Sequence, residues 1–447
     1  MDKLSRPIDD FSQPHRRIWG IAGPAILANS TAPIVGLVDV WAIGHVPDVA
    51  NLAAVGLGGI IFTYIFWAFG FLRMGTTGLI AQAAGIDAKD VVISQTLRSI
   101  ILGLFFAALL LLFQIPLLKL SFLALNPPEG VALIGTEYFN IRIWAAPATL
   151  FLYSVNGVLF GLGRAKEALF LQLFLNLTNA GLNLLFVVGM GMGVPGVALG
   201  TLIAEWSSAF FGLYIIIKLL GWNHILESLK NPRLIRYIEF HKIMVLNGFI
   251  FLRTLILMTA LAIIMRVAGS IGEAEMAASH VISQFNLLMS LGLDGFAHSS
   301  EALVGGAYGL KRKKVFLKWM YLTSLWARIA SGLYSVFFLY FGLDITGILT
   351  DLVSVRENVS GNLWVIISLP IVAVWSYQFD GIFIGATQAK AMMITMGLSF
   401  LVYLYSLSVL TPEGGLKGLW VAVLIFMGSR GVFQALYMPA LIKKIKN

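Results

Sequence analysis

The chain of 447 residues contains no cysteine. Disulfide frameworks, thiolate metal sites and cysteine nucleophiles are therefore excluded. Charged residues are also scarce, at 12%, whereas an average soluble protein carries roughly 25%. Hydrophobic residues make up 58%, and the mean hydropathy is +0.86. A chain with so little polar surface cannot cover a soluble globule, so it belongs in a lipid bilayer.

Motifs for catalysis or nucleotide binding are missing as well. The sequence has no Walker motif, no His-Glu-x-x-His and no Gly-x-Ser-x-Gly. His280 and His298 share one apolar run but lack the spacing of a metal site. We therefore expect neither an enzyme nor a bound cofactor or metal. Active transport by such a chain would have to draw on an ion gradient or on a partner.

Long apolar runs dominate what is present. A helical membrane span needs about 20 mainly apolar residues, and the runs do not alternate as barrel strands would. The fold class predicted is an all-α integral membrane protein with twelve spans. The runs are 18–43, 52–82, 94–118, 131–161, 167–189, 196–219, 241–267, 274–307, 315–342, 360–387, 391–411 and 416–441.

The net charge of +9 lies mainly in the connections between these runs. It therefore indicates membrane topology rather than a nucleic-acid partner, because Lys and Arg gather in cytoplasmic connections. The N-terminal seventeen residues do not resemble a cleaved secretory signal. We expect a multi-pass protein of the cell (inner, cytoplasmic) membrane with both termini in the cytoplasm. The basic residues of the termini and alternate connections are Lys3, Arg6, Arg16, Arg17, Lys89, Arg164, Lys166, Lys230, Arg233, Arg236, the run Lys311 to Lys314, Lys390, Lys443, Lys444 and Lys446.

An internal repeat divides the chain. Residues 153–166 and 377–390 both read Y-x-x-[N/D]-G-x-x-x-G-x-x-x-A-K, at an offset of 224. Each half holds six spans, which predicts a parallel repeat about an axis along the membrane normal. The expected domains are a cytoplasmic N-terminal segment 1–17, an N-terminal lobe 18–219, a cytoplasmic linker 220–240, a C-terminal lobe 241–442 and a cytoplasmic tail 443–447.

Two acidic residues inside spans are candidates for function, because ionisable groups in a bilayer are costly and usually functional. Asp39 near the outer end of the first span is either an interfacial aspartate or a proton site. Pro24 in the same span should kink the helix. Asp380 in the tenth span is either a structural partner of an arginine, for which Arg253 is a candidate, or a transport residue.

Polar residues in the first half form a second group. Asn179 and Asn183 are four residues apart on one helix face. Together with Tyr138 and Thr201 they could line a polar cavity, or they could make packing hydrogen bonds between helices. Glu205 and Arg430 are also within spans, as structural ion pairs or as cavity-lining groups.

The order of these residues resembles the multidrug and toxic compound extrusion (MATE) family, over the whole chain. Pro24 followed by Asp39, and the turn Gly193-Val-Pro-Gly196, carry part of the resemblance. Asp380-Gly-Ile-Phe-Ile-Gly-Ala-Thr387 resembles the DinF branch most closely, as do Leu293-Asp294-Gly295-Phe-Ala and Glu301-Ala-Leu-Val-Gly305.

The resemblance implies a cation-coupled antiporter that exports lipophilic, often cationic organic compounds (xenobiotic transport) through two lobes in a V-shaped arrangement. It implies a proton- or cation-binding network of Asp39, Tyr138, Asn179, Asn183 and Thr201, and helix bending at Pro24. Asp380, with Arg253, would bind a cationic substrate or form a second titrating site. The expected partners are small organic substrates and the bilayer, and the expected state is a monomer.

One departure bears on the coupling ion. Many relatives carry an aspartate where this chain has Asn183, and a sodium site needs several hard, negatively charged oxygen ligands. The acidic residue that NorM-type relatives use in the seventh span also has no counterpart, since Arg253 occupies that region. Proton coupling is therefore favoured over sodium coupling.

Two other functions remain as alternatives. A lipid-linked precursor flippase of the same superfamily would need several basic residues in its cavity, and the candidates are Arg73, Arg253, Arg266 and Arg430. A passive channel would fit the duplicated lobes and the buried carboxylates less well.

Overall fold

The computed structural model describes residues 7–44 and 49–445, without the side chains of residues 32, 34, 35, 37–44 and 49. These described residues are almost entirely helical and contain no strand. The N-terminal half contains α1 (Pro14–Gly44), α2 (Val49–Ala68), α3 (Phe71–Gly85), α4 (Lys89–Leu112), α5 (Gln114–Leu125), α6 (Glu129–Arg142), η1 (Ile143–Ala145), α7 (Ala146–Gly161), α8 (Ala165–Asn183), the π-helical η2 (Leu184–Gly189) and α9 (Gly193–Leu220). The C-terminal half contains α11 (Tyr237–Ile271), α12 (Glu273–Gly309), α13 (Lys313–Leu349), α14 (Val353–Gly361), α15 (Leu363–Gly385) and α16 (Ala389–Lys443), and the short α10 (Trp222–Leu229) lies in the linker.

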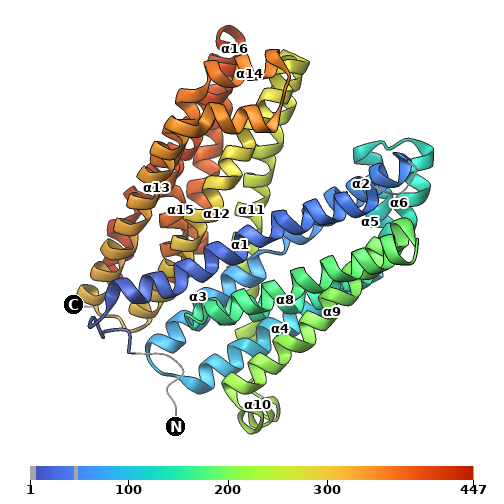
Figure 1. Ribbon diagram of the computed structural model, residues 1–447. Coiled ribbons are helices and arrows are strands. Elements are labelled where there is room, and N and C mark those ends of the chain that lie inside the picture. Colours follow the sequence, from blue (N-terminus) through green and yellow to red (C-terminus); the bar gives the residue numbers. More distant parts are fainter. Residues whose placement is uncertain (1–6, 45–48, 446–447) are drawn as a thin grey trace.

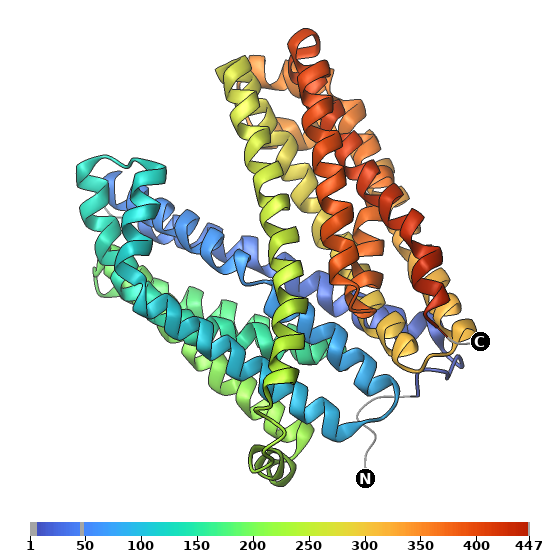
Figure 2. The same cartoon turned by 180° about the vertical axis from the view of Figure 1, so that it is seen from behind.

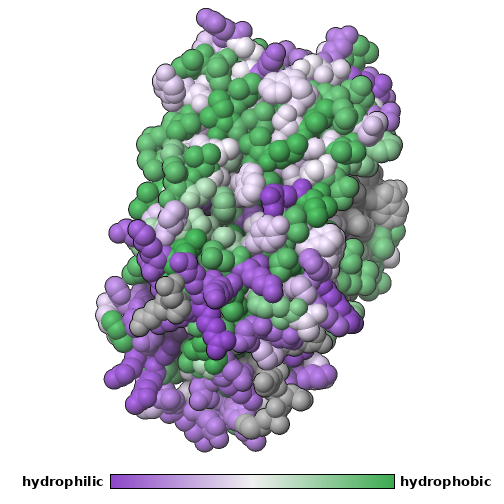
Figure 3. Space-filling model, turned by 90° about the vertical axis from the view of Figure 1, so that its left-hand side faces the viewer, coloured by the Kyte–Doolittle hydropathy of each residue, from purple (hydrophilic) through white to green (hydrophobic). Residues whose placement is uncertain are grey.

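The all-helical membrane fold predicted from the sequence is confirmed. In the described part of the chain, nine helical stretches are long and apolar enough to cross a membrane. One of them, α16, contains two passes, because Gly415 at φ 52° interrupts it in the left-handed region that favours glycine. With α1 and α12 the nine stretches account for the twelve expected spans. Figure 3 shows the broad apolar surface over these spans and the hydrophilic side chains gathered below it.

The helices form two lobes that meet near the chain termini and diverge toward the opposite end (Figures 1 and 2). Helices α2–α9 make up the N-terminal lobe and α11–α16 the C-terminal lobe. The contacts between the lobes come mainly from α3 and α1, which pack against α12, and from α3 against α11 and α15. We call the end near the termini, where the lobes meet, the closed end.

Backbone conformation follows the 224-residue repeat. Three left-handed positions recur at this offset: Asp87 with Lys311, Gly163 with Thr387, and Gly191 with Gly415. Helix ends recur as well, because α3 ends at Gly85 and α12 at Gly309, while α7 ends at Gly161 and α15 at Gly385. Helix α12 spans the counterpart of α2 and α3 without the interruption at residues 69–70. The duplication inferred from sequence is therefore a duplication of backbone geometry.

Close approaches between helix backbones are duplicated too. A Cβ atom on Gly157 would lie 2.7 Å from the carbonyl oxygen of Arg73 in α3, and one on Gly381 would lie 2.5 Å from that of Ala297 in α12. Residues 73 and 297 are 224 apart, so the two halves repeat the same contact. Only glycine permits this approach, as the Gly-x-x-x-Gly spacing predicts.

The two lobes touch through a reciprocal pair of contacts. Gly85 lies against the carbonyl oxygen of Gly306, and Gly309 lies against that of Gln82. The offset of 224 converts each contact into the other. Ala81 and Gly305, which also correspond, meet each other between these two contacts. The closed end is therefore pseudo-twofold symmetric, as a parallel repeat requires.

Helix α1 contacts both lobes, although its sequence position assigns it to the first. Trp19 packs edge-on against Phe296 of α12 with ring centroids 5.3 Å apart, and Ile26 lies over Gly295. Farther along α1, the Thr31 hydroxyl accepts a hydrogen bond of 2.6 Å from Asn176 of α8. Pro24 and Pro33 both lie inside the helix.

Replacing Gly381 with alanine should lower the free energy of unfolding by about 1–3 kcal/mol, because the added methyl overpacks the contact with Ala297. Thermal unfolding of the purified protein in detergent would measure the change. Gly397→Ala is the matched control: it lies on α16 with no atom within 4 Å of an added Cβ, and alanine should stabilise that helix by up to about 1 kcal/mol. Equal melting temperatures for the two variants would contradict the packing argument.

Candidate functional site

The structure brings together three residues of the predicted N-terminal network. Asn179 donates a hydrogen bond of 3.0 Å from its side-chain amide to the hydroxyl of Thr201 on α9, and Asn183 donates one of 3.3 Å to the side-chain oxygen of Asn179. Both asparagines are buried. The side chain of Asp39 lies outside the described residues, so its membership in this network stays a prediction.

Tyr138 lies in a neighbouring group of charges. It is buried on α6 against Gly58 of α2 and interacts electrostatically with Arg142. Arg142 in turn forms an ion pair of 2.6 Å with Glu205 on α9, and Thr149 also donates a hydrogen bond to Glu205. Glu205 is therefore held in a structural ion pair, which is one of the two roles that the sequence left open.

In the C-terminal lobe, Asp380 is the centre of a buried cluster. One carboxylate oxygen accepts hydrogen bonds from Arg253 and, at 2.8 Å, from Arg430. The other accepts a hydrogen bond of 2.6 Å from Gln434. The partnership of Asp380 with Arg253 follows the expectation from sequence, whereas Arg430 and Gln434 were not expected as further partners. With both oxygens occupied, this geometry fits the structural role of Asp380 better than direct substrate binding.

A third ionic group joins the two lobes, and it was not predicted from the sequence. Arg73 of α3 pairs with Glu301 of α12 at 3.1 Å and lies 3.4 Å from the Nδ1 atom of His298. The same Nδ1 atom is 3.3 Å from Glu301, and the imidazole stacks on Phe160 of α7 with centroids 4.4 Å apart. We call Arg73, His298 and Glu301 the interlobe cluster. The sequence signal for this cluster was the three-residue spacing of His298 and Glu301, which places both side chains on one helix face.

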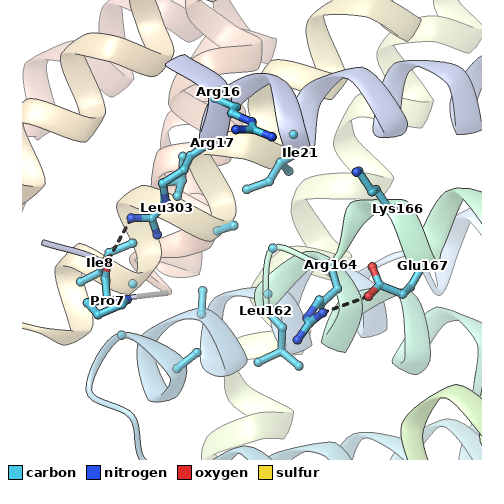
Figure 4. A pocket seen from close by; sticks show the side chains of 18 residues that line it. Pro7, Ile8, Arg16, Arg17, Ile21, Leu162, Arg164, Lys166, Glu167 and Leu303 are labelled. Carbon is cyan, nitrogen blue, oxygen red and sulfur yellow. Dashed lines mark hydrogen bonds and ion pairs between the residues drawn. The ribbon is translucent and has the colours of Figure 1, made fainter. Parts of the chain in front are cut away.

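The described part of the protein also contains two cavities of interest. The first, of about 600 Å³, lies at the closed end and is lined by basic side chains of α1 and of the turn between α7 and α8 (Figure 4). Arg164 is paired there with Glu167 at 3.2 Å. The second, of about 400 Å³, has contributions from both lobes. Its lining is nearly all apolar: Phe69, Phe71, Phe106, Leu109, Leu110, Phe113, Leu117, Met244, Asn247, Gly248 and Phe251.

Among the described residues, no group of three or more His, Asp or Glu side chains is arranged to hold a metal ion. Three of the four basic residues considered for a flippase are already engaged by carboxylates: Arg73, Arg253 and Arg430. The fourth, Arg266, is exposed on α11. The charges in the membrane interior are therefore largely balanced within the protein.

A family model and several known proteins match this chain. A family model described as MatE matches residues 24–185. The DNA damage-inducible protein F of Escherichia coli is 32% identical over 94% of this chain and 91% of that protein. The chloroplastic protein DETOXIFICATION 44 of Arabidopsis thaliana is 26% identical over 97% of this chain and 84% of that protein.

Solved structures agree on the fold. A multidrug resistance MATE family transporter of the MOP superfamily, in an outward-facing conformation, superposes with a TM-score of 0.87 at 19% identity, covering 97% of each chain. The likeness extends over both lobes, and the relative from Escherichia coli exceeds 30% identity over nearly the whole length. This chain therefore belongs to the MATE family of multipass membrane transporters and resembles the DinF protein of that family.

Proposed function

We propose that this protein is a proton-coupled antiporter that exports lipophilic, often cationic organic compounds by alternating access. The observation that carries the proposal is the arrangement of two lobes that meet at one end and diverge at the other (Figure 1). A known outward-facing transporter of the family has a closely similar fold. With both termini in the cytoplasm of an inner-membrane protein, the diverging end faces outward. The working unit is a monomer in the bilayer.

Proton coupling is assigned to Asp39. The described groups of the surrounding network, Asn179, Asn183 and Thr201, are neutral amides and a hydroxyl. A lone carboxylate with neutral neighbours can bind and release a proton, whereas sodium needs more negative oxygen ligands. Protonation from the outside would rearrange the network and bend α1 at Pro24, and the proton would leave to the cytoplasm.

The apolar cavity supports the choice of substrate. Aromatic and aliphatic side chains surround its volume of about 400 Å³, which is suited to the hydrophobic part of a small organic molecule. A flippase for pyrophosphate-linked lipids would need free basic groups, and Arg73, Arg253 and Arg430 are all paired. Lipophilic compounds are therefore the better-supported substrate class.

Replacing Asp39 with asparagine should abolish efflux driven by a pH gradient, because the amide cannot take up a proton. The measurement is efflux of a fluorescent organic cation from vesicles, with proton and sodium gradients imposed separately. Asp344→Asn, an exposed carboxylate on α13, serves as the control. Normal pH-driven efflux by the Asp39 variant would rule out this mechanism. Counterflow in proteoliposomes distinguishes a carrier from a channel, since a channel shows no exchange stimulation.

Replacing Asn183 with aspartate should introduce sodium dependence. The new carboxylate would stand beside Asn179 and add a hard, charged ligand to the predicted Asp39 site. Sodium-stimulated efflux, compared with potassium as the inert cation, would measure the gain. Asn176→Asp, two turns earlier on α8 and bonded to Thr31, is the control and should remain insensitive to sodium. An unchanged ion preference in the Asn183 variant would contradict the assigned reason for proton coupling.

Replacing Asp380 with asparagine should destabilise the protein by about 3–5 kcal/mol, because two buried guanidinium groups would lose their counter-charge. Asp351→Asn removes a carboxylate from an exposed pair with Arg356 and should change the melting temperature little. Thermal unfolding in detergent compares the two variants. If Asp380→Asn unfolds at the wild-type temperature but loses transport, Asp380 acts on substrate or protons and the structural assignment is wrong.

A further inference from the structure

Among the described residues, one carboxylate in the membrane interior has no direct partner. Glu205, Glu301 and Asp380 are each bound to at least one arginine. Asp294 of α12 is half-buried, and it forms no hydrogen bond or ion pair with any described residue. Away from helix ends, it is the one buried or half-buried acidic side chain of the described residues in this situation. An unpaired ionisable group at this depth is a candidate functional site.

The position of Asp294 along α12 marks the boundary of the contact between the lobes. It comes 21 residues after Glu273 and 15 before Gly309, roughly 32 and 22 Å from the helix ends at 1.5 Å per residue. Every residue from 295 to 307 is buried, whereas Asp294 keeps exposed surface. Asp294 therefore stands where α12 emerges from the buried contact, on the side away from the closed end.

Helix geometry also indicates the direction that Asp294 faces. Residues three and four apart share a helix face, so Asp294, His298, Glu301 and Gly305 form one row. Gly305 lies against Ala81 of the other lobe, and His298 and Glu301 contact Arg73. The row runs from the closed end through the interlobe cluster and ends at Asp294. The carboxylate consequently faces the N-terminal lobe at the point where the lobes begin to diverge.

The charges around Asp294 leave it available to a ligand. Its electrostatic neighbours are His298, Arg73, Glu301 and Asp380, and Tyr377 of α15 is also close. Arg73 is committed to Glu301, and the arginines nearest Asp380 are committed to Asp380. These three arginines share two carboxylates, Glu301 and Asp380, and none of them is hydrogen-bonded to Asp294. In a low-dielectric site, a carboxylate that no protein cation contacts directly favours an incoming cation.

We propose that Asp294 is the carboxylate that binds the positive charge of the exported organic cation. The ligand class is a lipophilic ammonium or phosphonium ion, whose hydrophobic part needs no specific partner. This inference rests on the proposed export function and adds a binding residue to it. It also separates Asp294 from Asp380, whose carboxylate is filled by Arg253, Arg430 and Gln434.

The location of Arg73 would make this site depend on conformation. Arg73 belongs to α3, whereas Asp294 belongs to α12, so separation of the closed end carries the arginine away from the carboxylate. With the closed end shut, Arg73 neutralises Glu301, so opening that end adds the negative charge of Glu301 to that of Asp294. A cation near Asp294 would be held more tightly once that end opens. With the termini in the cytoplasm, the protein would bind the cation from inside and release it outside.

The test is equilibrium binding of radiolabelled tetraphenylphosphonium to the purified full-length protein. Asp294→Asn should weaken binding about tenfold or more, because the ion pair with the ligand is lost. Binding of the uncharged analogue triphenylphosphine oxide should change less than about twofold, since only the Coulomb term is removed. Asp294→Glu should restore part of the affinity, and Asp344→Asn should bind as the wild type does. Each variant is checked for monodispersity and melting temperature.

Wild-type affinity for tetraphenylphosphonium in Asp294→Asn, with transport of this cation by the wild type intact, would overturn the inference and leave the proposed function standing. Failure of the wild type to export any cation would instead overturn the proposed function. If the Asp294 variants misfold, a second experiment tests the inference on the wild-type protein alone. Modification of Asp294 by a hydrophobic carbodiimide, read by mass spectrometry, should be slowed by tetraphenylphosphonium, and an unaffected rate would also overturn the inference.

Discussion

Direct contact between helix backbones is the constraint on which the rest of this structure depends. Lipid removes the hydrophobic drive that joins helices in water, so association relies on close packing. Glycines 157 and 381 bring α7 onto α3 and α15 onto α12. The same approach places Asp380 next to Gly381 and puts the backbone of Glu301 beneath Gly385. The ionic groups are thus positioned by contacts in which they take no part themselves.

The duplicated frame carries charges that are not duplicated. The counterpart of Arg73 is Ala297, that of Glu301 is Thr77, and that of Asp380 is Asn156. The two halves therefore share one backbone arrangement but have different ion pairs. The interlobe cluster needs the arginine of α3 and the glutamate of α12, and neither residue type is present at the corresponding position of the other helix. Asp294 corresponds to Gly70, at the interruption between α2 and α3. The unbroken path of α12 through this position provides a continuous helix on which a carboxylate can be held at depth.

The sequence was sufficient for the parts that depend on local or repeated patterns. Run lengths predicted the spans, and the offset of 224 predicted the duplication. The interruption at residues 69–70 and the short α10 in the linker were missed, because hydropathy alone does not register a break or a surface turn of helix. A side-chain pair between two helices was predicted once, for Arg253 with Asp380. Arg430 and Gln434 come from a helix 50 residues and more away, and hydropathy does not determine which helix faces which. In the sequence, Asp294 stood out only as part of a family motif. That it lacks a hydrogen-bonding or ion-pair partner can be seen only in the three-dimensional structure.

The dual attachment of α1 has a mechanical consequence. Near its start, Trp19 and Ile26 are fixed to the C-terminal lobe, while Thr31 is bonded to α8 of the other lobe. Any relative rotation of the lobes therefore shears this one helix over little more than a turn. Pro24 and Pro33 flank that stretch and supply no backbone N–H donors, which lowers its bending stiffness. Helix α1 is attached to both lobes, so the extent to which it can bend limits how far the lobes can separate.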